Sequence, residues 1–180
     1  MANVNNPYGF LPVGRTNEGG MLRIQRLNKA AGYAPAMYPG DIVHRIADGT
    51  IESNSFTPGT TLVTGVNMSY SPGSTLTSQD VVVSQSALYE AQDDGAGAVG
   101  IVAADLGLNT NAVVGAPRGA AVTARKSAHQ IGVAAKAVAA TLDMHLLEHV
   151  ADPTNDVTAA NARVIVIFNK HRMASASVGV

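Results

Sequence analysis

Cysteine is absent from this 180-residue sequence, and charged residues make up only 14% of it. The absence of cysteine excludes disulfides, thiolate metal sites and cysteine nucleophiles, so packing and association must stabilise the fold. Charged residues make up about 25% of an ordinary soluble domain, so much of this surface must consist of Ser, Thr, Asn, Gly and Ala. Partners cover such a surface easily. The length allows one domain with a hydrophobic core plus an arm or tail.

Long apolar runs are also absent. No stretch approaches the roughly 20 apolar residues that span a bilayer. The start, MANVNNPYGF, has no basic region followed by an apolar stretch. We therefore expect neither a transmembrane helix nor a secretion signal, and no membrane partner.

Positive charge is absent from the middle of the sequence, because no Lys or Arg lies between Arg45 and Arg118. The net charge is +3 over residues 1–45, −7 over residues 46–117 and +3 over residues 118–180. These segments either pair within one subunit or form complementary surfaces between neighbouring subunits, and both interpretations stay open. The basic residues are scattered, with only Arg125 and Lys126 adjacent, so we expect no nucleic-acid partner.

Residues 1–20 are dense in Asn, Pro and Gly, which excludes a long helix. The aromatic and aliphatic residues between these breakers are apolar enough to dock on a surface. We expect an extended N-terminal arm over residues 1–20, anchored by Tyr8 and Phe10, and the alternative is a strand folded onto its own domain. The residues expected to contact a partner or a neighbouring subunit are Asn5, Pro7, Tyr8, Phe10 and Pro12.

From Met21 to about Val83, short apolar stretches alternate with turn signals, which predicts a β-rich region. The stretches MLRIQRL, DIVHRI, TTLVTGV and DVVVS are typical of strands, and the pair Asp48-Gly49 favours a tight hairpin. Residues 92–119 are rich in Gly and Ala, and a strand, a short helix or a long loop all remain open there.

The clearest strand is RVIVIFNKH, residues 163–171, because β-branched and aromatic residues dominate it. Both of its faces are apolar, which is typical of a sheet centre, a barrel wall or a sheet that a second subunit covers. The residues expected in a buried core or a subunit interface are Val164, Ile165, Val166, Ile167 and Phe168.

The preceding segment AAKAVAATLDMHLLEHV favours a helix on propensity. Even spacing of apolar residues over residues 142–150 favours a strand instead, and the turn-forming run DPTND follows it. We therefore expect two strands, 142–150 and 163–171, while a short helix or turn through Ala140 stays open. The sequence predicts a mainly β fold, a barrel or sandwich-like domain over residues 21–180 with the arm and little helix.

One glycine motif, GAGAVG at residues 95–100, fits the Gly-x-Gly-x-x-Gly pattern of phosphate-binding loops. Asp93 and Asp94 directly precede it and would repel a pyrophosphate, and no acidic residue occurs from 106 to 142 to hold a ribose. We expect a flexible or tightly packed glycine loop, and no nucleotide or other cofactor.

The segment HLLEH, residues 145–149, fits the inverted zinc-protease pattern, in which a helix places two His ligands one turn apart. No Glu follows Glu148 to act as that family's third ligand. On a strand, His145 and His149 would lie about 13 Å apart, at a rise of roughly 3.3 Å per residue. That distance is too large for a shared metal. We therefore expect neither a metal site nor catalysis.

Five stretches follow one another in a set order: NPYGFLPVGR, YPGDIVHR, Gly65-Val66 with the turn SYSPG, LYEAQDDG, and ATLDMHLLEHVADPTNDVTAANARVIVIFNKHRM. In this order and spacing they resemble the head decoration, or capsid cement, proteins of tailed bacteriophages, and the resemblance spans nearly the whole chain. The sequence departs from the family's pattern at two places, which bear on the contacts of the arm and on the shape of one loop. The run Phe10 to Val13 lacks a basic residue just before its proline, and residues 119–136 lack the family's Ser-Gly turn.

The resemblance implies a β-rich fold without an active site. It implies homotrimers at local threefold positions on the outer capsid surface, bound to the major capsid protein, and residence in the host cytoplasm during assembly. The N-terminal contact residues would then lie on the capsid or a neighbouring subunit, and the strand at residues 164–168 in a core or threefold interface. The alternatives are a tail or head–tail adaptor protein and, less favoured, a metal hydrolase that uses His145, Glu148 and His149.

Overall fold

The fold is mainly β, as the sequence predicts. The computed structural model describes residues 3–16, 21–73, 77–96, 99–115 and 126–173. Over these residues the only helical element is the 3-10 turn η1 (Ala103–Asp105), and no helix is long and apolar enough to cross a membrane. The sheets are open over the described residues, so the sandwich-like form of the prediction is confirmed.

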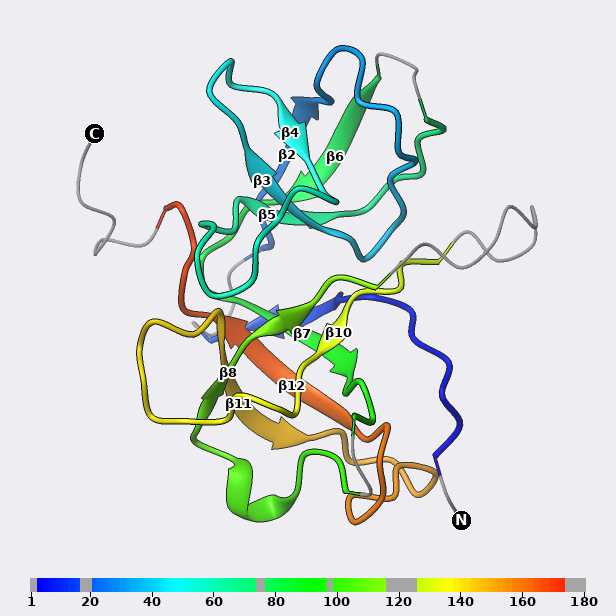
Figure 1. Ribbon diagram of the computed structural model, residues 1–180, viewed down its shortest axis with the longest axis vertical. Coiled ribbons are helices and arrows are strands. Elements are labelled where there is room, and N and C mark those ends of the chain that lie inside the picture. The colour runs from blue at the N-terminus through cyan, green and yellow to red at the C-terminus, as the bar shows by residue number, and fades with distance from the viewer. Residues whose placement is uncertain (1–2, 17–20, 74–76, 97–98, 116–125, 174–180) are drawn as a thin grey trace.

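Two five-stranded sheets account for most of the strands (Figure 1). The upper sheet has the order β2-β6-β5-β3-β4, with β2 (Ile24–Asn28), β3 (Ile42–Arg45), β4 (Ile51–Glu52), β5 (Gly65–Asn67) and β6 (Ser78–Val82). The lower sheet has the order β1-β7-β12-β11-β8, with β1 (Leu11–Arg15), β7 (Ala87–Gln92), β8 (Asn109–Thr110), β11 (Met144–His149) and β12 (Arg163–Phe168). A small third sheet pairs β9 (Ala112–Val113) with β10 (Gln130–Ile131).

The main hydrophobic core contains buried residues of both large sheets. At its centre the Phe168 ring lies 5.4 Å from the Phe10 ring and 5.1 Å from the Tyr89 ring, between ring centroids. Such tilted aromatic pairs add about 0.5–1.5 kcal/mol each beyond the area they bury. The residue before β1 and the strands β7 and β12, which are distant in sequence, are therefore held together at one point.

Strands β3, β5 and β6 of the upper sheet are largely buried on both faces, whereas β2 is largely exposed. Val82 of β6 lies in the main core, whereas Val81 and Val83 lie in a second core beneath the segment that carries Tyr33 and Met37. The run DVVVS is apolar on both faces for this reason, since alternate side chains point to opposite sides of a strand.

The predicted Asp-Gly hairpin joins β3 to β4. Arg45 pairs with Ile51 across the turn, and the Ile46 N–H donates to the Thr50 carbonyl at 3.0 Å. Gly49 has a φ of 85°, a left-handed conformation that glycine adopts without a steric penalty.

The N-terminal segment lies along the body of its own chain. Asn3 Nδ2 donates to the Asp156 carbonyl at 2.7 Å, and the Phe10 N–H donates to the Gly40 carbonyl at 3.0 Å. Residues 11–15 form β1, which pairs with β7 at the edge of the lower sheet. Residues 11–15 therefore have the form of the alternative that the sequence left open for residues 1–20, a strand folded onto its own domain.

The expected C-terminal strand pair is present. Strands β11 and β12 are antiparallel neighbours, with Met144 opposite Phe168 and a β-bulge between Leu146 and Glu148. Turns rather than a helix precede β11. Strand β12 is the third of the five strands of the lower sheet, as expected for a strand that is apolar on both faces.

Candidate functional site

The outer face of the lower sheet carries aliphatic side chains, whereas one face of an antiparallel sheet is commonly polar and solvated. On β12, Val164, Val166 and Phe168 point into the core, and the alternation leaves Ile165 and Ile167 half-buried on the opposite face. The five residues predicted for a core or interface are thus divided between two faces. Two of them are available to a neighbouring molecule.

The strand registers identify the neighbours of these two isoleucines, because directly paired residues share a face of the sheet. Ile165 pairs with Glu90 of β7, and Glu90 in turn pairs with Leu11 of β1. Ile167 pairs with His145 of β11. Leu88 of β7 lies on the same outer side, since its neighbours along the strand point into the core.

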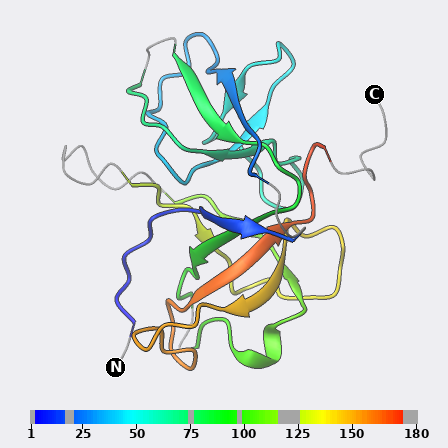
Figure 2. The same cartoon turned by 180° about the vertical axis from the view of Figure 1, so that it is seen from behind.

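We call this surface the apolar sheet face, and its members are Leu11, Val13, Leu88, Ile165 and Ile167. Leu11 is 41% exposed and Val13 is 49% exposed, while the other three are half-buried. Figure 2 shows the outer sides of β12 and β11 turned toward the viewer. Glu90 lies between Leu11 and Ile165 on this face. Aliphatic side chains gathered on one face of a sheet are typical of a protein–protein contact.

A chain of polar contacts runs from Glu90, between Leu11 and Ile165, to the border of the apolar sheet face. The Tyr8 hydroxyl donates to Glu90 Oε1 at 2.6 Å, and Arg163 bridges Glu90 at 3.5 Å and Asp152 at 2.6 Å. Burial, and then this contact with the Glu90 carboxylate, raises the pKa of Tyr8. The hydrogen bond from Arg163 lowers the pKa of Asp152. Tyr8, a predicted contact residue, is therefore neutral and held at the edge of the face.

A hollow of about 530 Å³ opens beside this border, between the N-terminal segment and the loop after β11. Its walls include Asn6, Tyr8, Gln92 and Arg163. Gln92 Nε2 donates to the Val4 carbonyl at 2.9 Å, which fixes the N-terminal segment against β7.

The predicted N-terminal contact residues differ in exposure. Phe10 and Pro7 are buried, and Phe10 packs in the main core of its own chain. Asn5 is exposed, and Tyr8 and Pro12 are half-buried. A partner contact by these three residues stays a prediction.

The two histidines of the HLLEH motif lie on a strand, β11, rather than on the helix that the zinc-protease pattern requires. His145 Nδ1 lies 2.8 Å from Asn109 Oδ1, and His149 Nε2 lies 2.8 Å from the Ile101 carbonyl oxygen. Within the described residues, no three His, Asp or Glu side chains are grouped so that they could hold a metal ion.

The glycine motif closes over a buried carboxylate, and its residues 97–98 lie outside the described residues. Asp93 is fully buried, and its two oxygens accept hydrogen bonds from the backbone N–H groups of Gly95, Asn161, Ile101 and Ala162, at 2.7–3.1 Å. A side chain at Gly100 would collide with this carboxylate. Asp93, which we expected to repel a phosphate, therefore occupies the centre of the loop itself.

Asp41, Ser53 and His129 come together in the interior, a cluster that their positions in the sequence do not indicate. His129 Nε2 lies 3.7 Å from Asp41 Oδ1 and 3.5 Å from Ser53 Oγ. His129 Nδ1 accepts a hydrogen bond from the Ile42 N–H at 3.1 Å, so Nε2 carries the proton of the neutral ring. A protonated Nε2 cannot take a proton from Ser53. Burial lowers the pKa of His129 and raises that of Asp41.

This cluster joins the upper sheet to the segment before β10, and its His129 and Asp41 side chains are 2% and 5% exposed. A substrate therefore has no access to it. The arrangement fits a structural role rather than nucleophilic catalysis.

No protein-family model, curated protein or solved structure matches this chain.

Proposed function

We propose that this chain is a non-enzymatic structural protein of a tailed bacteriophage. It binds the outer surface of the capsid as a homotrimer and stabilises the head, and its partners are the major capsid protein and its own copies. The ordered sequence resemblance to decoration proteins supports this identity. The structural observation that supports it most directly is the apolar sheet face.

The apolar sheet face supports self-association for a physical reason. Burial of apolar surface gives about 25 cal/mol per Å², and β1, β7 and β12 present five aliphatic side chains on one side. The face of one subunit meets a different surface of the next around a threefold axis, and three such contacts close a ring. Each trimer then offers three copies of its capsid-binding surface, so avidity multiplies modest individual contacts.

Oligomeric state tests the self-association step. We expect native mass spectrometry to give a trimer for the wild-type chain and a monomer for Ile167→Asp, because a carboxylate cannot be buried unpaired in an apolar contact. The matched control is Ile24→Asp, since Ile24 is 58% exposed on the upper sheet. It should remain trimeric. A trimer that survives Ile167→Asp would contradict the interface, and a wild-type hexamer or larger ring would favour the tail or adaptor alternative.

Location in the particle tests the capsid role. A cryo-EM reconstruction of the virion that carries this chain should show trimeric density at local threefold positions on the outer shell. Density in the tail or at the head–tail junction would contradict the proposal. A deletion of residues 2–13 is a weaker test, because it also removes Phe10 from the main core.

A further inference from the structure

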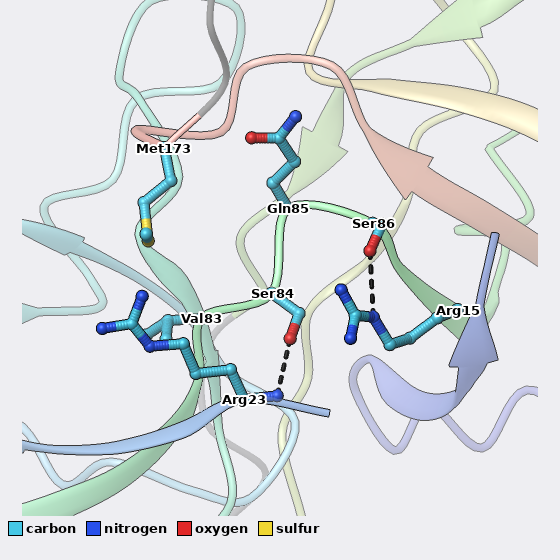
Figure 3. Close-up of a pocket in the computed structure, with 7 residues that line it drawn as sticks. All are labelled: Arg15, Arg23, Val83, Ser84, Gln85, Ser86 and Met173. Carbon is cyan, nitrogen blue, oxygen red and sulfur yellow. Dashed lines mark hydrogen bonds between the residues drawn. The ribbon is translucent and has the colours of Figure 1, made fainter. Parts of the chain in front are cut away.

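Four arginines surround two adjoining hollows on the side of the molecule where the two large sheets meet. The first hollow, of about 270 Å³, is lined by Arg15, Arg23, Val83, Ser84, Gln85, Ser86 and Met173 (Figure 3). The second, of about 240 Å³, is lined by Gln25, Arg45, Thr64, Val83, Arg172 and Met173. Val83 and Met173 belong to both hollows, so these form one continuous surface. We call its arginines the arginine cluster.

The arginine cluster is assembled from four separate parts of the chain. Arg15 ends β1, Arg23 directly precedes β2, Arg45 ends β3 and Arg172 follows β12. The two basic ends of the sequence therefore meet at one place. The acidic middle of the sequence contributes no carboxylate to the lining of either hollow.

The arginine cluster differs from the other arginines of the described chain in having no ionic partner. Arg26 lies 3.2 Å from Asp80, and Arg163 lies 2.6 Å from Asp152. Among the described residues, no carboxylate lies within 4.0 Å of any member of the cluster. Like charges that are gathered without counter-charges create a positive potential, which draws anions.

Hydrogen bonds fix the side chain of Arg15 and the backbone of Arg23. Arg15 Nε donates to Ser86 Oγ at 3.0 Å and its Nη1 donates to the Met21 carbonyl at 2.8 Å, while the Arg23 N–H donates to Ser84 Oγ at 2.6 Å. Figure 3 shows the guanidinium groups of Arg15 and Arg23 on either side of Ser84. Arg23 and Arg172 are exposed, so their guanidinium donors are available to a ligand.

We propose that the arginine cluster binds an acidic segment of a partner protein, through carboxylates that enter the two hollows. Guanidinium groups bind carboxylates with two parallel hydrogen bonds. Met173, which lines both hollows and is 49% exposed, supplies an apolar surface for the aliphatic stems of the acidic side chains. This proposal is independent of the capsid role, since any acidic protein partner would satisfy it.

Nucleic acid, the other polyanion, fits the same surface less well. Single strands bind on aromatic side chains that stack with bases, and neither hollow is lined by Phe, Tyr or His.

Binding of a labelled polyglutamate peptide to the full chain, followed by fluorescence anisotropy, tests the proposal. We expect saturable binding that weakens with added salt. The double variant Arg23→Gln/Arg172→Gln should bind about a hundredfold more weakly, because each of its two lost charge-assisted contacts is worth about one factor of ten. The matched control Arg26→Gln removes an exposed arginine outside the cluster and should leave the affinity unchanged.

Three results would overturn the proposal: no saturable binding, equal weakening by Arg26→Gln, or tighter binding of an oligothymidylate than of the peptide. The single variants Arg23→Gln and Arg172→Gln are measured as well, and circular dichroism confirms that each is folded. Because the assay uses neither capsids nor trimers as its readout, its failure would leave the proposed capsid role untouched.

Discussion

Asp93 offers the sharpest test of what holds the lower half of the molecule together. Its carboxylate joins the glycine loop to the turn before β12 through four backbone N–H donors, two on each oxygen. Asp93→Asn keeps the shape of the side chain but replaces one oxygen with an NH₂ group. That group faces two N–H donors, so two buried hydrogen bonds are lost.

The expected loss in the free energy of unfolding follows from those two hydrogen bonds. Each buried N–H that is left unpaired costs about 1–3 kcal/mol, which gives a loss of about 2–6 kcal/mol. A neutral amide is cheaper to bury than a carboxylate, so we expect a net loss of about 3 kcal/mol. Total stabilities are typically about 5–15 kcal/mol, so the change is a large fraction of the whole.

Urea unfolding, followed by circular dichroism because the chain has no tryptophan, measures the free energy of unfolding at a fixed protein concentration. The matched control is Glu148→Gln, the same chemical change at an exposed position on β11. It should shift the free energy of unfolding by no more than about 0.5 kcal/mol. The reasoning is refuted if Asp93→Asn is as stable as the wild type, or if the control is destabilised equally.

Two further predictions concern stability. Burial lowers the pKa of His171 from 6.5 to about 4, so the unfolded chain takes up a proton there before the folded chain does. Stability is therefore lost as the pH falls from 6.5 toward 4, by about 2 kcal/mol between pH 7 and pH 5. His171→Gln should show that much less loss in urea titrations at the two pH values, and an unchanged pH dependence would contradict the role of burial. Phe10→Ala should cost about 3–5 kcal/mol, because Phe10 is buried in the main core. Val138→Ala should cost less than about 1 kcal/mol, because Val138 is 83% exposed and loses few contacts, and equal effects would place Phe10 outside the core.

Strand identity could be predicted from local composition over residues 21–83 and 142–171, whereas β7, β8, β9 and β10 lie in segments for which the sequence predicted no definite strand. β-Branched and aromatic residues predicted β12, the even spacing of apolar residues predicted β11, and the Asp-Gly pair predicted the hairpin of β3 and β4. The structure contains all of these elements. These signals are local, because strand propensity and turn geometry depend on a residue and its near neighbours. The same local reasoning left the form of residues 1–20 open between an arm and a strand, since docking depends on which surface lies nearby.

The candidate site could be predicted only in part. The apolar character of residues 164–168 was visible, but which side chains face the core depends on the register of β12 against β7 and β11. The arginine cluster had no sequence signal at all, because its members are distributed from Arg15 to Arg172.

The sequence alone therefore determined a cysteine-free, mainly β chain whose charge changes sign twice along its length. Only the tertiary structure decided that two isoleucines of β12 lie on the outer face, that Asp93 is the buried centre of a loop, and that four arginines share one surface. The physical reason is that strand formation is set by neighbouring residues, whereas sheet order and register are set by the packing of segments far apart in sequence. A surface assembled from four distant segments exists only after that packing is complete.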